Sequence, residues 1–391
     1  MMKRLFILSV IVALAVSLLA SCSKEPSVVR IPVASDVPIN FASLIPETKG
    51  APQLISLERL AAQDFSVSAW YAPEGETFGS SSIRYFNNHR FGTLDLENYS
   101  LWQGINSTRD AAAPVYYPLD GSLTYFCFAP YRADVDPAGS SDIKLIPEPS
   151  STITDQLPNY LPYSPLIVFT PEVYPSRQID FITSTPIVDA TRASGSLPLD
   201  FTNHLTSSIE FYCKYSGAID PTEGVMIDQI VIRDVISSEY LYFTESAGVF
   251  GHDWCSTISP DDPLSSTMPV TTYTLKAANG DLITADAFLS DTGYKYVNNT
   301  NNGCLYLLPQ TLPADAYLDI TYSIRRRITN ASLDENVVSI PISGTSAWLP
   351  NKIIRYYIAV NIANRNDVEL TVSIIDWNDS GNTHAEMELM Y

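Results

Sequence analysis

The sequence has few of the groups on which enzyme chemistry depends. Only four of its 391 residues are histidines, and none of the HExxH, G-x-S-x-G or P-loop patterns occurs. A lone histidine such as His204, with no metal partner or nucleophile at a useful spacing, is predicted to be a packed, hydrogen-bonded residue. We therefore expect no enzymatic activity, no cofactor and no metal site.

Helical signals and basic charge are also scarce. Charged residues make up 17% of the chain, which is low for helical surfaces, and no long segment shows an apolar period of about 3.6 residues. The 23 Lys and Arg residues are outnumbered by 43 Asp and Glu residues, which gives a formal net charge of −20 at pH 7. A surface of this sign repels phosphate backbones, so we expect no nucleic-acid partner.

Cysteines are few and widely spaced, without any CxxC pair. Four of the five follow Cys22, and in an oxidising compartment they could form two disulfides with three possible connectivities. Two of them lie inside apolar, strand-like runs, where a free cysteine behaves as a small buried residue. We favour that unpaired state, and both alternatives stay open for Cys127, Cys213, Cys255 and Cys304.

The N-terminus has the pattern of a lipoprotein signal peptide. The basic residues Lys3 and Arg4 precede the apolar run 5–19, which is shorter than the about 20 residues that a membrane span needs. The run ends in Leu19-Ala20-Ser21-Cys22, the small-residue pattern that lipoprotein signal peptidase reads. We predict that Cys22 carries a lipid and anchors the mature chain to a membrane. The alternatives are an ordinary signal peptide and a short anchor helix.

The residues that the chain has in quantity are typical of β-structure. Its 23 Tyr residues suit a pleated, half-buried surface, and its 27 Pro residues mark loops and edges. Phe65–Tyr71 alternates with period 2, and Val115–Tyr131 has the pattern of a strand, an Asp-Gly turn and a second strand. A hairpin is predicted over residues 84–92, with its turn at Asn87-Asn88. Many such strands with turns between them predict β-sandwiches.

The mature chain is too long for one ordinary core, so the sequence predicts two domains. The small-residue stretch Thr191–Ser196 suits the boundary between them. The predicted division is a signal peptide over 1–21, a tether over 22–36, an N-terminal β-sandwich over 37–192 and a C-terminal β-sandwich over 193–391.

The tryptophans suggest where a ligand could bind. Trp70 and Trp377 fall inside strand patterns and are predicted core residues. Trp102 and Trp254 fall in loops and are better candidates for exposed contact with a glycan or a host protein, although an aromatic side chain is more often buried than binding.

A set of short motifs also follows in order along almost the whole chain, and together they resemble the fimbrillin family, the subunits of type V pili in Bacteroidales bacteria. The resemblance implies two transthyretin-like antiparallel β-sandwich domains in tandem and export as an outer-membrane lipoprotein of the cell surface. It also implies removal of the first strand by a trypsin-like protease and polymerisation by strand exchange. The motifs are the lipobox with the strand Val37–Leu44 and Thr48-Lys49 after it, Tyr116–Tyr131, Gln178–Ile182, Leu197–Phe211, Leu308-Pro309-Gln310, Trp348–Lys352 before Tyr356-Tyr357, and Asp376-Trp377.

The resemblance also assigns residues to assembly. Family members are cut after Arg, whereas the loop behind the first strand here offers Lys49, so we predict cleavage after Lys49, with Arg59 as second choice. The first strand has one apolar face, and after the cut this face would leave the groove that it fills. A C-terminal strand over residues 384–391 would refill the groove of a neighbouring subunit, unless it is an edge strand of its own domain. The displaced residues are Val37, Ile39 and Phe41, and the donor residues are Ala385, Met387, Leu389 and Tyr391.

The sequence thus predicts a structural subunit of a fimbria. Its expected partners are other pilus subunits, a trypsin-like processing protease and the outer membrane, which it would reach through its lipid. The alternative is a surface lipoprotein that does not polymerise, such as a pilus tip or anchor adhesin, and binds a glycan or a host protein.

Overall fold

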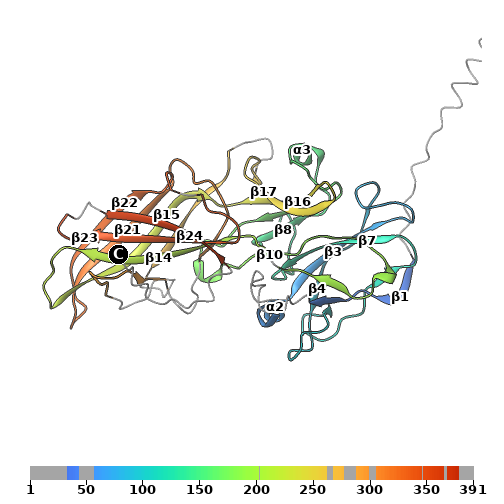
Figure 1. Cartoon of the computed structure of the whole chain (residues 1–391), viewed down its shortest axis with the longest axis horizontal. Helices are drawn as coiled ribbons and strands as arrows, with labels where there is room; N and C mark the ends of the chain where they lie inside the picture. The colour runs from blue at the N-terminus through green and yellow to red at the C-terminus, as the bar shows by residue number, and fades with distance from the viewer. Residues whose placement is uncertain are drawn as a thin grey trace, which may run out of the picture. The chain divides into compact units, whose positions relative to one another are not determined.

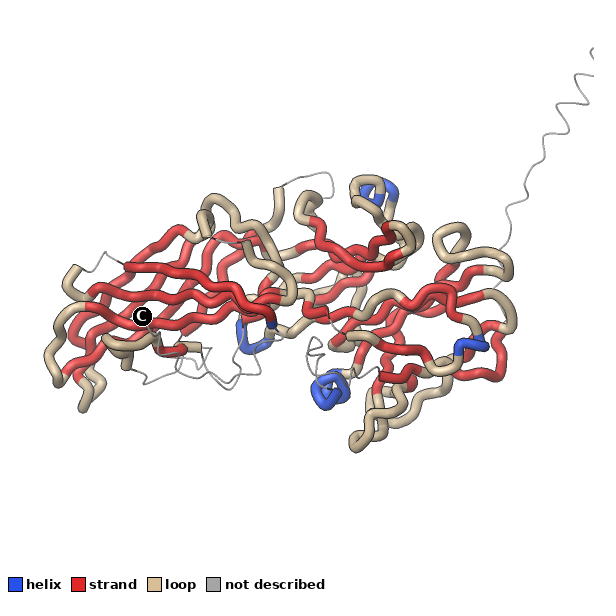
Figure 2. The backbone as a smooth tube through the Cα atoms, viewed as in Figure 1, coloured by secondary structure: helices blue, strands red, loops and turns tan. Residues whose placement is uncertain are grey.

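The structure is a computed structural model that describes residues 33–43, 57–201, 203–261, 267–276, 288–298, 305–345, 347–364 and 368–377. Strands dominate these residues, so the predicted all-β class is confirmed (Figure 2). No helix in the described ranges is long and apolar enough to span a membrane. The short helices are α2 (Leu57–Gln63), α3 (Ser151–Thr154), η1 (Pro175–Arg177) and η2 (Arg192–Ser194).

A central sheet is built around two strands that are buried on both faces. Its strand order is β13-β10-β7-β3-β4-β5, and β11 also pairs with β7. All residues of β3 and β7 are buried, with Tyr71 and Tyr125 on one face and Trp70 and Phe126 on the other. The bounds are β3 (Phe65–Ala72), β4 (Ile83–Gly92), β5 (Gln103–Gly104), β7 (Ser122–Ala129), β10 (Ile182–Thr183), β11 (Ile187–Ala190) and β13 (Asn203–His204).

The predicted hairpin at Asn87-Asn88 is wrong, because β4 runs through this dipeptide as one bulged strand beside β3. Asn88 takes the left-handed conformation, with φ of 51°, which absorbs the extra residue of the bulge. The Asn side chains accept hydrogen bonds from Ser66 and Ser68 of β3, at 2.7 and 3.0 Å, instead of closing a turn.

One face of the central sheet is covered by short strands from distant parts of the sequence. β1 (Ala34–Pro38) pairs antiparallel with β6 (Tyr116–Pro118), and β2 (Phe41–Ser43) pairs parallel with β12 (Leu197–Leu199). The predicted strand–turn–strand over Val115–Tyr131 is confirmed as strands, although β6 is paired with β1 and not with β7.

The other face packs against a sheet with the order β17-β16-β9-β8 (Figure 1). This sheet joins strands from both sides of the predicted boundary at residue 193, and that boundary stays a prediction. The bounds are β8 (Ile143–Ile146), β9 (Leu166–Phe169), β16 (Glu239–Ser246) and β17 (Val249–Cys255).

The remaining strands form two sheets around the largest core. One has the order β19-β14-β23-β24, with β20 also on β14, and the other has the order β18-β15-β21-β22. Side chains such as Phe211, Ile232 and Tyr356 meet between them. The transthyretin-like tandem layout stays a prediction. The bounds are β14 (Ser207–Ser216), β15 (Glu223–Ile236), β18 (Val270–Lys276), β19 (Lys295–Tyr296), β20 (Leu305–Leu307), β21 (Tyr317–Arg326), β22 (Ser332–Pro341), β23 (Lys352–Asn361) and β24 (Val368–Asp376).

The cysteines in the described ranges are small core residues. Cys127, Cys213 and Cys255 are buried and free, as favoured from the sequence, and Cys304 lies outside the described residues. Burial raises the pKa of the Cys127 thiol to about 12, so the thiol stays protonated at neutral pH.

Glu239, the first residue of β16, is an unfavourable group inside the fold. It is fully buried, and neither carboxylate oxygen has a hydrogen-bond partner among the described residues. Burial and the nearby Asp253 raise its pKa to about 8. The folded chain therefore keeps a proton on Glu239 at pH values where the unfolded chain, with the usual pKa of 4.5, has released it.

This proton gives a testable pH dependence. Between pH 4.5 and about 8 the folded state binds one proton more than the unfolded state at this position, so the Glu239 contribution to stability falls as pH rises. We expect Glu239→Gln to make the fall in melting temperature from pH 5 to pH 8 smaller than in the parent chain. The control is Glu245→Gln on the exposed end of β16, which should leave the slope unchanged. An equal slope in all three proteins would contradict the assignment.

Candidate functional site

The candidate site is the apolar pocket in which the first strand segment, residues 34–43, is buried. We call this pocket the seat of the first strand. Val37 lies in β1, Phe41 begins β2, and Ile39 lies in the break between the two strands. Ile39 and Phe41 are 2% and 0% exposed, and Val37 is half-buried against the same core. The period-2 pattern of the sequence therefore finds the buried face, although the backbone is two short strands and not one.

Phe41 occupies an aromatic pocket made by residues far from it in sequence. Its ring meets Phe65, Phe91 and Tyr125 edge-on, with centroid distances of 5.9, 5.2 and 5.6 Å. These rings belong to β3, β4 and β7 of the central sheet. Edge-to-face pairs at such distances contribute about 0.5–1.5 kcal/mol each beyond the burial of area. Phe41 is therefore the main side-chain anchor of the first strand.

The backbone of residues 34–43 is held by short, separate pairings. The Ile39 amide donates to the Val115 carbonyl at 2.8 Å, and Phe41 and Trp102 exchange amide–carbonyl bonds of 2.9 Å. The Leu197 amide donates to the Asn40 carbonyl at 3.0 Å, beside the parallel β2–β12 pair. None of these contacts is a long ladder, so side-chain burial contributes most of the attachment.

Removal of residues 34–43 would uncover an apolar groove. Uncovered apolar surface costs about 25 cal/mol per Å², and the backbone groups that now pair with the segment would lose their partners. A second strand with apolar side chains at every other position would cover the apolar surface again and would pair with these backbone groups. The groove beneath residues 34–43 is therefore apolar and is bordered by backbone groups that pair with a strand. Its walls come from Phe65, Phe91, Trp102, Tyr117, Tyr125, Leu197 and Phe201.

A buried ion-pair cluster fixes the chain just behind this segment. The Asp64 carboxylate, 1% exposed, lies 2.6 Å from the Arg90 guanidinium and 3.0 Å from that of Arg109. Arg109 also donates to the carbonyls of Ala61 and Ala62, which satisfies the last turn of α2. Sequence reasoning missed this cluster, because its members are isolated single charges in different segments.

Of the two predicted cleavage residues, only Arg59 lies in a described segment, and it is part of α2. The residues after it, Leu60 and Ala61, are 3% and 2% exposed. The other assembly residues, Cys22, Lys49, Ala385, Met387, Leu389 and Tyr391, lie outside the described residues.

The expectation that Trp102 is exposed is wrong, because it is 0% exposed and lies beside the first strand. Trp254 is half-buried and donates from Nε1 to the Leu205 carbonyl at 3.0 Å. The predicted loop position of Trp254 is wrong, because the residue lies in β17 and pairs with Leu241 of β16. Trp70 is buried, as predicted.

His204 is the packed residue that the sequence predicts. Its Nδ1 lies 2.9 Å from the buried Asp180 carboxylate, and its ring stacks on Trp377 at 4.2 Å. Among the described residues no group of three or more His, Cys, Asp or Glu side chains could hold a metal ion.

No family profile matches the chain, and no curated protein matches it. Among solved structures, a fimbrial protein from Bacteroides vulgatus aligns over 87% of this chain and 99% of its own, with a TM-score of 0.57 and 14% identity. The chain has the fold of this fimbrial protein. The expected resemblance to fimbrial subunits is thus confirmed at the level of the fold. A candidate cell adhesion protein from Bacteroides uniformis aligns over 88% of this chain and 100% of its own, at 11% identity and a TM-score of 0.45, which adds nothing to the assignment.

The aromatic pocket around Phe41 predicts how a substitution at this position changes the stability of the fold. Phe41→Ala should lower the free energy of unfolding by about 3–5 kcal/mol, because it empties a pocket with rigid aromatic walls. Val33→Ala, at a side chain that is 70% exposed, is the matched control and should change it by less than about 0.5 kcal/mol. Urea unfolding of both variants measures the difference. Equal stabilities would show that the Phe41 pocket does not anchor the strand.

Proposed function

We propose that this protein is a structural subunit of a cell-surface fimbria that polymerises by strand exchange. The observation that carries the proposal is the seat of the first strand, where Ile39 and Phe41 fill an aromatic pocket while the backbone is held by short pairings. Such a segment is removable once the chain behind it is cut, and the groove that it leaves accepts a similar strand. The fimbrial fold supports the same function.

In this proposal the chain reaches the outer membrane as a lipoprotein. The lipid on Cys22 anchors the precursor, and the tether over residues 22–36 connects it to the first strand. A trypsin-like protease then separates the anchored segment from the rest. The other partners of this chain are further pilus subunits.

We propose Lys49 as the cleaved residue in preference to Arg59. Trypsin-like proteases bind their substrate in an extended conformation over several residues. At Arg59 this would require α2 to unwind and Leu60 and Ala61 to leave the core. The Arg109 bonds to the end of α2 oppose that unwinding. Lys49 lies between Pro46 and Pro52, next to Gly50, in a sequence typical of an accessible loop.

The cleavage site is tested by replacing each of the two basic residues with alanine in separate variants. Lys49→Ala should leave a folded monomer that a trypsin-like protease no longer converts into polymer, whereas Arg59→Ala should polymerise like the parent chain. Polymers that survive mild heating in detergent are counted on a gel, and mass spectrometry identifies the new N-terminus. Normal polymers from Lys49→Ala would place the cut elsewhere or make it unnecessary.

The donor in this proposal is the C-terminal segment 384–391 of a neighbouring subunit. Ala385, Met387, Leu389 and Tyr391 recur at every second position, as Val37, Ile39 and Phe41 do in the strand to be replaced. The matching period would let the donor present one apolar face to the groove.

Deletion of Glu386–Tyr391 tests the donor. The truncated subunit should keep its melting temperature and be cut normally, yet form no polymer. A full-length control with serine at positions 387, 389 and 391 should behave in the same way, because it keeps the length and removes the apolar face. A drop in melting temperature on deletion would instead assign the segment to an edge strand of its own domain.

A further inference from the structure

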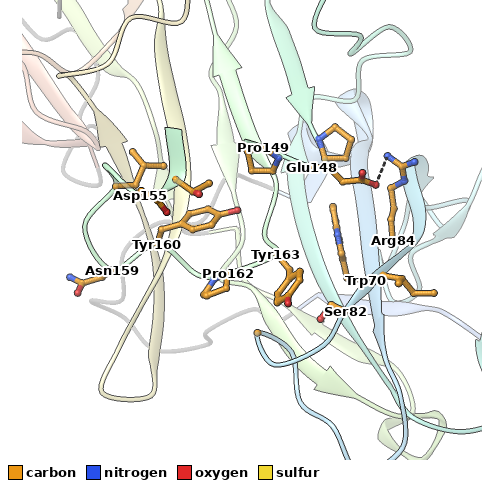
Figure 3. A pocket seen from close by; sticks show the side chains of 15 residues that line it. Trp70, Ser82, Arg84, Glu148, Pro149, Asp155, Asn159, Tyr160, Pro162 and Tyr163 are labelled. Atoms are coloured by element: carbon orange, nitrogen blue, oxygen red, sulfur yellow. Dashed lines mark ion pairs between the residues drawn. The ribbon is translucent and has the colours of Figure 1, made fainter. Parts of the chain in front are cut away.

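A cleft separate from the strand seat lies beside the edge of the central sheet (Figure 3). Its cavity volume is about 920 Å³, within the range of about 300–1,000 Å³ that is usual for ligand sites. One wall comes from β3, the start of β4 and the loop between them. The opposite wall comes from residues 147–163, which connect β8 to β9.

The cleft presents ring faces at an open surface. Tyr163 is 47% exposed although it is a large aromatic residue, and the exposed Pro162 lies next to it. Tyr160 projects into the cleft from the same wall, and its hydroxyl donates to the Ser164 carbonyl, which fixes the ring. Trp70, 2% exposed, closes the cleft from the side of the sheet. These rings form flat apolar surfaces within one concave site.

Polar groups with unused hydrogen-bonding capacity lie around these rings. Ser82 Oγ is buried and has no partner among the described residues, and Asp155 and Asn159 are exposed on the opposite wall. Arg84 and Glu148 form an open ion pair at 3.7 Å, and their side chains are 41% and 75% exposed. The ion pair therefore leaves several donors and acceptors available.

We propose that this cleft binds a neutral oligosaccharide. The C–H face of a pyranose ring packs on an aromatic ring, and sugar hydroxyls both donate and accept hydrogen bonds, which matches the groups of both walls. A lipid or an apolar peptide would remove water from the Arg84–Glu148 ion pair and bury Asp155 without a partner, at a cost of several kcal/mol. An anionic glycan would meet two carboxylates and one guanidinium in a chain of net charge −20. A neutral sugar can hydrogen-bond to the charged groups of the cleft and is not repelled by its carboxylates.

Calorimetric titration with maltotetraose, cellotetraose, chitotetraose and lacto-N-tetraose tests the site. We expect at least one of these four probes to bind the parent chain, and Tyr163→Ala and Asp155→Ala each to weaken that binding at least tenfold. The matched control is Tyr174→Ala, because Tyr174 is 58% exposed and lies outside the cleft lining. This variant should bind like the parent chain. Unchanged melting temperatures in all three variants confirm that they are folded.

Lack of binding to all four probes would overturn the proposal. Sugar binding that is unchanged by Tyr163→Ala would also overturn it, and so would a cleft that binds a proline-rich peptide and no sugar. The result is independent of assembly, because Lys49→Ala should bind the oligosaccharide like the parent chain even when it forms no polymer. A subunit that polymerises and binds no sugar would therefore refute the cleft assignment alone.

Discussion

Strands buried on both faces impose the strongest constraint on this structure, because each face needs its own cover. β3 and β7 are such strands, with Tyr71 and Tyr125 on one side and Trp70 and Phe126 on the other. The second side has a full sheet against it. The first side is covered in part by a single short segment that carries Ile39 and Phe41. The stability of the sheet and the strand exchange that we propose thus depend on the same apolar contact.

Local patterns in the sequence predict much of what is buried. The alternation of Phe65–Tyr71 identifies β3, and the alternation of Ile39 and Phe41 identifies the side chains that enter the core. Period 2 is a local property of the backbone, so short windows of sequence contain it.

Pairing partners could not be predicted in this way, because they depend on contacts between distant segments. Asn87-Asn88 has the composition of a turn, yet hydrogen bonds to the serines of β3 keep it inside a strand. Trp102 lies in a loop, and the bond exchange with Phe41 buries it. The carbohydrate cleft combines residues near 82 with residues near 160, and neither segment has a recognisable motif by itself.

The parallel pairing of β2 with β12 also sets an order in time. β12 follows β2 by roughly 150 residues, so during synthesis the first strand leaves the ribosome long before Leu197 and Phe201 exist. Until then Ile39 and Phe41 have an incomplete enclosure. The segment 34–43 is therefore made well before the strand that completes its enclosure, and it reaches its final contacts only after Leu197 and Phe201 have been made.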